Sequence, residues 1–133
     1  MLYYTPQIWC SDNTDAVDRL YIQYGTSFAY PCSTVGAHVA ACPNEHSGRV
    51  TPFSTRAAVA SAGTFGYELD LKALPFETRE KVRAQVRWYK RIAPLVQQGR
   101  YHRLSSPLSD PVCAWEHVLE DGSQALVSAV VLE

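Results

Sequence analysis

Apolar runs and helical spacings alternate along most of this chain. Three apolar runs predict buried strands, at 7–10, 34–41 and 64–67. A segment with apolar residues at helical spacing follows each run, at 15–24, 54–62 and 77–98. Beyond Gly99 the pattern predicts three further strands, at 101–104, 113–119 and 125–132. The sequence Glu120-Asp121-Gly122-Ser123 between the last two is typical of a hairpin, so we expect three βα units followed by antiparallel strands.

The length limits what this fold can be. The chain has 133 residues, whereas a complete (β/α)8 barrel takes about 250. A hydrophobic content of 47% and a charged content of 19% argue against disorder. We therefore predict an α/β fold in two parts, with the βα units over residues 1–98 and the start of an antiparallel β domain over 99–133.

Charge and cysteine usage narrow the function classes. A net charge of −1 gives no electrostatic attraction to nucleic acid or to an anionic membrane. The helix at 77–98 is rich in Arg and Lys, and a solvated face with Glu77 and Glu80 nearby explains this better than a nucleic-acid-binding helix does. No run is long enough to span a bilayer, and the N-terminus does not read as a signal peptide. Four widely spaced cysteines predict free, mostly buried thiols in a reducing compartment.

The most informative carboxylate is Asp12. It follows the apolar run at 7–10, and in β/α proteins the loop after a strand's C-terminal end is where ligands and catalytic groups lie. It also belongs to Ser11-Asp12-Asn13-Thr14, a cluster of residue types that cap helix N-termini. Spacing alone favours a cap, so a functional role for Asp12 needs a second line of support.

A metal site is the other pattern considered. His38, Cys42 and His46 lie four residues apart. On a strand and its following loop this spacing does not converge as it would on one helix face, and a structural zinc site requires four ligands. We therefore expect no metal here.

The second line of support for Asp12 is a resemblance. The segment 3–15, Tyr3-Tyr4-Thr5-Pro6-Gln7-Ile8-Trp9-Cys10-Ser11-Asp12-Asn13-Thr14-Asp15, resembles the acid/base segment of α-galactosidases of glycoside hydrolase family 36. The likeness continues in order through Ile22-Gln23-Tyr24-Gly25-Thr26-Ser27, Gly36-Ala37-His38-Val39, Ala41-Cys42-Pro43-Asn44, Gly48-Arg49-Val50-Thr51-Pro52, Gly63-Thr64-Phe65-Gly66-Tyr67-Glu68-Leu69-Asp70, Arg103-Leu104-Ser105-Ser106-Pro107 and Ala114-Trp115-Glu116. A match this long favours a functional Asp12 over a residue that only caps, and it allows Asp12 both roles.

The resemblance implies where the chain sits in a larger enzyme. It implies the last three βα units of a (β/α)8 TIM barrel, followed by the first strands of a C-terminal β-sandwich. Met1 matches an internal methionine of the family pattern, and the chain stops within the expected sandwich at Leu132-Glu133. We therefore expect both ends to be truncations, and the final Leu-Glu could be a vector remnant.

The resemblance also implies a chemistry. Asp12 would be the general acid/base of a retaining glycosidase acting on α-galactosides such as melibiose or raffinose, and Trp9 would line the galactose subsite. Burial beside an aromatic ring and a nearby negative nucleophile would favour the protonated form that an acid needs. The family's nucleophile motif, of Lys-Trp-Asp type, is absent, so we expect the chain alone to be inactive. No cofactor is implied, since carboxylates and water suffice.

Other expectations stay open at this point. Arg19 could orient the segment around Asp12 or form a surface ion pair, and Arg49 could line the cleft. Family members are often cytoplasmic oligomers, which implies the same location and self-association for this protein. The alternatives are a non-catalytic module that binds carbohydrate or a partner chain, and a related enzyme that uses another sugar donor.

Overall fold

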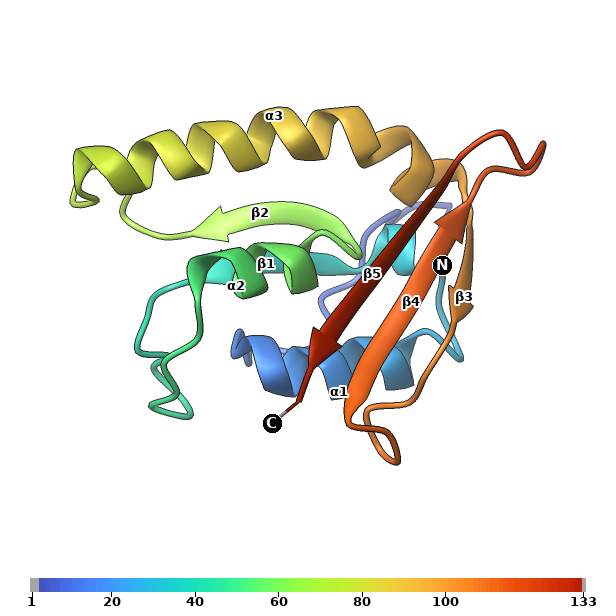
Figure 1. Ribbon diagram of the computed structural model, residues 1–133, viewed down its shortest axis with the longest axis horizontal. Coiled ribbons are helices and arrows are strands. Elements are labelled where there is room, and N and C mark those ends of the chain that lie inside the picture. The colour runs from blue at the N-terminus through green and yellow to red at the C-terminus, as the bar shows by residue number, and fades with distance from the viewer. Residues whose placement is uncertain (1–2, 133) are drawn as a thin grey trace.

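The elements follow the predicted order. The computed structural model describes residues 3–132, so Met1, Leu2 and Glu133, which bear on the expected truncations, lie outside the described residues. Along the chain come α1 (Ala16–Thr26), a 3-10 turn η1 (Cys32–Thr34), β1 (Gly36–Ala40), α2 (Phe53–Ala60), β2 (Thr64–Glu68), α3 (Phe76–Gln98), β3 (Arg100–Arg103), β4 (Val112–Val118) and β5 (Ala125–Val131) (Figure 1). All three predicted helices and five of the six predicted strands are present to within a few residues.

The first predicted strand is reduced to a single point of pairing. Ile8 forms an isolated parallel bridge with Val35, in which the Ile8 amide donates to the Thr34 carbonyl at 2.8 Å and the Gly36 amide donates to the Ile8 carbonyl at 3.0 Å. β1 then pairs with β2 in parallel over its whole length. The Ile8 segment, β1 and β2 therefore lie side by side in that order and run in the same direction.

Helices cover one face of this parallel unit. Side chains alternate across a strand, and Ala37 and Val39 of β1 pack in a buried cluster with two alanines of α2. Phe65 of β2 joins the same cluster and stacks on Tyr89 of α3 at a ring-centroid distance of 4.8 Å. The alternate residues, among them His38 and Gly66, therefore face away from these helices.

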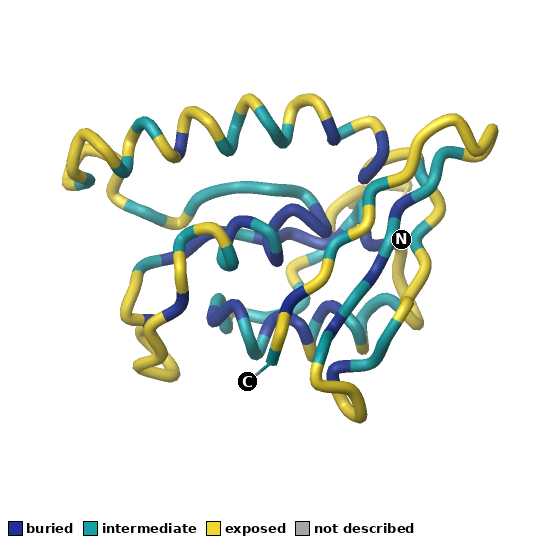
Figure 2. Tube along the Cα trace, in the orientation of Figure 1, coloured by how far each residue is buried: buried dark blue, intermediate teal, exposed yellow. Residues whose placement is uncertain are grey.

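The C-terminal strands form a separate antiparallel sheet of order β3-β4-β5. The predicted hairpin joins β4 to β5, and Gly122 adopts the positive φ of 69° that the turn requires. A buried cluster links this sheet to the first two helices. It contains Ala16 and Leu20 of α1, Val59 of α2, Ala62 just after α2, and Cys113, Trp115 and Val130 of the sheet. Figure 2 shows these buried stretches in α1, α2 and β4, with the outer turns of α3 exposed.

The basic helix is solvated on its outer face. Its buried residues are Val82, Ile92, Leu95 and Val96, while its arginines and lysines are all exposed. Arg83 forms an ion pair with Glu80 on this surface. Within residues 3–132 no helix combines the length and the apolar character needed to cross a bilayer.

Candidate active site

The segment that leads into α1 is shaped by its own side chains. The Asn13 amide donates to Ser11 Oγ at 3.1 Å, and the Asp15 amide donates to Asn13 Oδ1 at 2.9 Å. The Asn13 side chain also donates to Asp18 Oδ2 at 2.8 Å. These bonds hold the turn between the Ile8 segment and the helix in one conformation without regular secondary structure.

The helix cap is Asp15, not Asp12. Asp15 Oδ1 accepts from the Val17 amide at 2.9 Å and from the Asp18 amide at 3.0 Å, and the helix begins at Ala16. The expectation that Asp12 could cap as well is therefore wrong, because Asp12 lies too far before the first helical residue. Its carboxylate has no structural duty at the helix end.

Asp12 is exposed and takes a single hydrogen bond. The Trp9 indole Nε1 donates to Asp12 Oδ1 at 2.6 Å, and among the described residues nothing bonds Oδ2. The burial expected around Asp12 is not provided by this chain, since the residue is exposed. What the chain does provide is an orientation, fixed by one donor on one oxygen.

Trp9 also contacts a second ring, in a tilted arrangement. Its indole lies against the His38 imidazole of β1, with ring centroids 4.7 Å apart and planes 35° apart. The side chain remains 55% exposed. Trp9 thus connects the parallel strands to Asp12, and an aromatic surface stays open beside the carboxylate.

Arg19 is buried, which favours the orienting role over a surface ion pair. Its Nη2 donates to the Gly36 carbonyl at 2.7 Å, and its Nη1 donates to the Ser11 carbonyl at 3.4 Å. Its Nε donates to Gln23 Oε1 at 3.3 Å. Among the described residues, Arg19 therefore bonds carbonyl oxygens and pairs with no carboxylate. It ties β1 to the residue immediately before Asp12.

Arg49 reaches the same segment from the loop at 42–51. It pairs with Asp15 and with Asp18, the latter at 3.2 Å. Ser47 of that loop donates its hydroxyl to Asp15 Oδ2 at 2.7 Å, and Asn44 donates its side-chain amide to Thr14 Oγ1 at 3.2 Å. The loop after β1 is thereby fastened to the turn before α1.

The bonds from Ser47 and Arg49 help to set the charge state of Asp15. Burial alone favours the neutral acid, but the Asp18 amide, the Ser47 hydroxyl and the Arg49 charge all favour the anion. Together they hold the pKa of the Asp15 carboxyl below its usual value. Asp15 is therefore a structural anion, only 1% exposed.

The structure brings all four predicted site residues to one region: Trp9, Asp12, Arg19 and Arg49. Arg49 pairs with Asp15 and Asp18, so it holds the loop at 42–51 against the turn before α1. Within residues 3–132 no three His, Cys, Asp or Glu side chains converge as metal ligands, so His38, Cys42 and His46 do not form such a group. Cys32 and Cys113 are buried free thiols, whereas Cys42 is exposed.

Sequence reasoning missed two contributors, Asp15 and His38. The interval from Asp15 to the first apolar helical residue, Ala16, was the available signal that Asp15 is the cap. His38 had no such signal, because its contact with Trp9 spans strands that only the fold brings together.

Comparison with known proteins decides the family. The family model for melibiase matches residues 1–99. The chain belongs to the melibiase family. Among curated members, the bifunctional alpha-galactosidase/sucrose kinase AgaSK of Mediterraneibacter gnavus is 55% identical over 99% of this chain. The alpha-galactosidase AgaA of Geobacillus stearothermophilus is 52% identical over 96% of it. The chain covers 14% of the first and 18% of the second, so it spans about a sixth of the length of these melibiases.

Solved melibiase structures match the fold closely. The galactosidase domain of AgaSK superposes with a TM-score of 0.97 over the whole chain and 18% of that domain. The glycoside hydrolase family 36 α-galactosidase AgaA of Geobacillus stearothermophilus gives 0.94 at 52% identity, over 97% of this chain and 18% of its own. The resemblance to family 36 is thus confirmed, and the α/β arrangement matches part of these enzymes.

Proposed function

We propose that this chain is the acid/base-carrying part of a retaining α-galactosidase. In this assignment residues 1–98 are the last three βα units of the catalytic (β/α)8 barrel, and residues 99–133 open the C-terminal β-sandwich. Two parallel strands and the bridged Ile8 segment, with helices on one face and a separate antiparallel sheet after them, support that division. Asp12 then lies after a barrel strand's C-terminal end, where barrel enzymes hold their catalytic groups.

The observation that carries the proposal is the bond between Trp9 Nε1 and Asp12 Oδ1. It fixes one carboxylate oxygen and leaves Oδ2 to hold the catalytic proton. In the first step Oδ2 protonates the glycosidic oxygen while a nucleophilic carboxylate attacks the anomeric carbon. In the second step Asp12 takes a proton from a water molecule as that water attacks the same carbon; the bond to the nucleophilic carboxylate breaks and galactose is released.

The nucleophile must come from another part of the protein. A retaining pair of carboxyl groups stands about 5–5.5 Å apart across the sugar. Asp15 is buried as a helix cap, and Asp18 is bound by Asn13 and Arg49. Neither can attack a sugar on the far side of a cleft, so we expect the chain alone to be inactive.

Trp9 is placed to form part of the sugar site. Its indole has His38 against one side and is more than half exposed. A flat ring of this kind packs on the apolar face of a pyranose. Variants of AgaA have been solved with raffinose and with stachyose, which supports α-galactosyl oligosaccharides as the substrate class here. Cytoplasmic location and self-association stay predictions.

The test uses a complete site. We would replace the matching segment of Geobacillus AgaA with residues 3–132 of this chain and assay raffinose hydrolysis, with Asp12→Ala as the variant and Asp121→Asn in the distant hairpin as the control. Loss of general acid/base catalysis costs about 10²- to 10⁴-fold. Azide, which needs no general base, should restore turnover of an activated aryl galactoside by Asp12→Ala and yield an α-galactosyl azide.

Two results would overturn the proposal. One is an exchanged enzyme with the parent's melting temperature and no hydrolysis. The other is an Asp12→Ala variant as active as the control on raffinose. Hydrolysis by residues 1–133 alone would contradict the expected need for a nucleophile from elsewhere. Binding of raffinose to the isolated chain, together with an inactive exchanged enzyme, would favour a non-catalytic carbohydrate-binding module.

A further inference from the structure

We propose that His38 and Gly66 are positioning residues for the acid/base. In this arrangement Gly66 leaves room for the His38 ring, His38 supports the Trp9 indole, and Trp9 orients Asp12. The inference rests on the proposed function of Asp12. It adds two residues that never touch the substrate.

The first step is the place of His38 on its strand. In the parallel ladder His38 lies directly opposite Gly66. Its neighbours Ala37 and Val39 point into the cluster with α2, so His38 points to the other side, where Trp9 meets it. A histidine that only filled the helix-facing core would lie on the opposite face.

The second step is the room that two glycines leave. A Cβ on Gly66 would come within 2.7 Å of His38 Cδ2, and a Cβ on Gly36 would come within 3.3 Å of Trp9 Cε3. The first distance is shorter than carbon atoms tolerate without a shift. Each ring thus lies across a glycine of the adjacent strand. Trp9 and His38 form a ring pair, tilted by 35°, that extends from the Ile8 segment across β1 towards β2.

The third step is the electrical state of His38. Burial lowers the pKa of its imidazole, with the Arg19 charge acting in the same direction and Glu68 acting against both. The ring is therefore neutral at neutral pH. A neutral ring can stack on an indole without the cost of holding a charge away from water.

The consequence for catalysis follows from the contacts that link His38 to Trp9 and Trp9 to Asp12. Trp9 is more than half exposed; its indole Nε1 bonds Asp12, and its ring lies against the His38 ring. Without His38 the indole gains rotational freedom, and Asp12 loses its fixed orientation. A general acid matters most when the leaving group is a poor one, such as a sugar alkoxide, and least when it is an activated phenolate.

The experiment compares the two leaving groups in the exchanged enzyme. His38→Ala removes the ring, His38→Phe keeps a flat ring, and Gly66→Ala displaces the ring. His46→Ala, on the exposed loop, is the control. We expect His38→Ala and Gly66→Ala to lower kcat/KM for raffinose about 10- to 100-fold, a part of the general-acid contribution. They should change kcat/KM for dinitrophenyl α-galactoside far less, because an activated phenolate leaves without being protonated. His38→Phe should restore most of the raffinose activity.

An equal loss on both substrates would overturn the inference, because it would mean a general structural defect. So would a His38→Ala variant as active on raffinose as His46→Ala. Asp12→Ala in the same series separates this from failure of the proposed function. If Asp12→Ala shows no dependence on the leaving group, the acid/base assignment is wrong. If the loss of activity in Asp12→Ala depends on the leaving group but that in His38→Ala does not, only the positioning role of His38 is wrong.

A second measurement needs no catalysis. The 133-residue chain has three tryptophans, and Trp9→Phe assigns the Trp9 indole N–H resonance. A bond to Asp12 shifts this resonance downfield, and Asp12→Asn should remove much of the shift. If the inference holds, His38→Ala moves the Trp9 resonance towards that of Asp12→Asn, whereas His38→Phe does not. An unmoved resonance in His38→Ala would contradict it.

Discussion

Ser47 donates its hydroxyl to Asp15 Oδ2 at 2.7 Å, and so joins the loop after β1 to the cap of α1. Arg49 from the same loop pairs with the other oxygen of Asp15. One buried carboxylate therefore ends a helix and anchors a loop at the same time. Both duties lie three residues beyond the proposed acid/base, so the rigidity of this segment depends on Asp15.

Two substitutions of Asp15 should lower the free energy of unfolding by different amounts. Asp15→Asn keeps an oxygen for the helix amides but loses the charge that Arg49 pairs with, and we expect a cost of about 1 kcal/mol. Asp15→Ala loses both and should cost about 2–3 kcal/mol in the free energy of unfolding. Urea titration of the chain measures both, with Glu45→Ala in the exposed loop as the control. Equal costs for the two variants would argue against a role for the helix cap.

His117 should make stability depend on pH. It is 1% exposed, and burial lowers the pKa of His117 to about 4, although the Ala62 backbone offsets part of this shift. The unfolded chain binds a proton near pH 6.5, so between these values unfolding takes up a proton and stability rises with pH. The contribution is complete above pH 6.5 and should fall by about 3 kcal/mol as the pH drops towards 4.

Urea titrations at a series of pH values would check this against His117→Phe, which cannot titrate. The wild-type chain should lose more stability between neutral pH and pH 4.5 than the variant does. Parallel curves for the two proteins would contradict the buried neutral state of His117.

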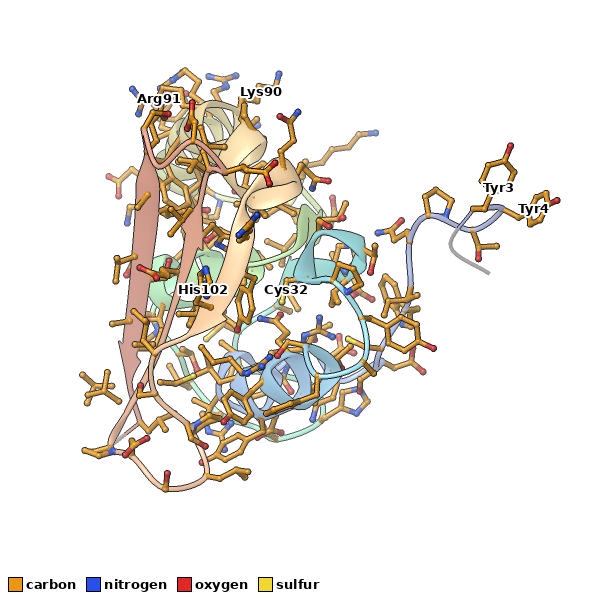
Figure 3. The ribbon with its side chains drawn as sticks, turned by 90° about the vertical axis from the view of Figure 1, so that its right-hand side faces the viewer. Tyr3, Tyr4, Cys32, Lys90, Arg91 and His102 are labelled. Atoms are coloured by element: carbon orange, nitrogen blue, oxygen red, sulfur yellow. The ribbon has the colours of Figure 1, made fainter. Side chains whose placement is uncertain are left out.

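Arg19 should be costly to replace, although it pairs with no carboxylate within residues 3–132. Arg19→Met keeps the apolar stem but leaves the Gly36 carbonyl without its donor in a buried site, and we expect a loss of about 2–3 kcal/mol. Arg19→Lys can satisfy one carbonyl only and should lose somewhat less. Arg91 lies on the exposed outer face of α3 (Figure 3), and Arg91→Met should stay within about 0.5 kcal/mol of wild type. Thermal and urea unfolding would rank the three.

Two glycines should respond to alanine in opposite directions. A Cβ on Gly63 would lie 2.4 Å from the Val35 carbonyl oxygen, a backbone atom that cannot move aside. Gly63→Ala should therefore destabilise the chain by about 2 kcal/mol or more. Gly25, within α1, has open space around its Cβ position, so Gly25→Ala should stabilise by about 0.5–1 kcal/mol. A stable Gly63→Ala variant would mean that β1 and β2 do not approach as described.

The order of elements could be predicted because each depends on local pattern. Alternation along β4 and β5, the turn at Gly122 and the helical spacing from Phe76 to Gln98 are all short-range signals. Ile8 was harder to place. A strand prediction rests on apolar residues, but pairing depends on what lies alongside, and within residues 3–132 only Val35 pairs with this segment.

The candidate site was predictable only in part, for a similar reason. Asp12 and Trp9 were found through resemblance, and spacing alone would have assigned Asp12 to a cap. For Arg19 the sequence left two roles open, because arginines are rarely buried and one of its partners, the Gly36 carbonyl, lies 17 residues away. The conformation of the N-terminal segment was not predictable from local pattern either. Tyr3 and Tyr4 stand at the end of an extended stretch that projects from the body (Figure 3), which no local pattern announces.

The close approach of Gly66 to His38 also constrains how this family can vary. Because a Cβ at position 66 and an imidazole at position 38 compete for the same space, a mutation at either position alone should be unfavourable. Relatives that carry a side chain at position 66 should therefore carry a smaller residue at position 38, and a changed partner where Trp9 stands. These positions, on separate strands, are expected to evolve as a correlated set.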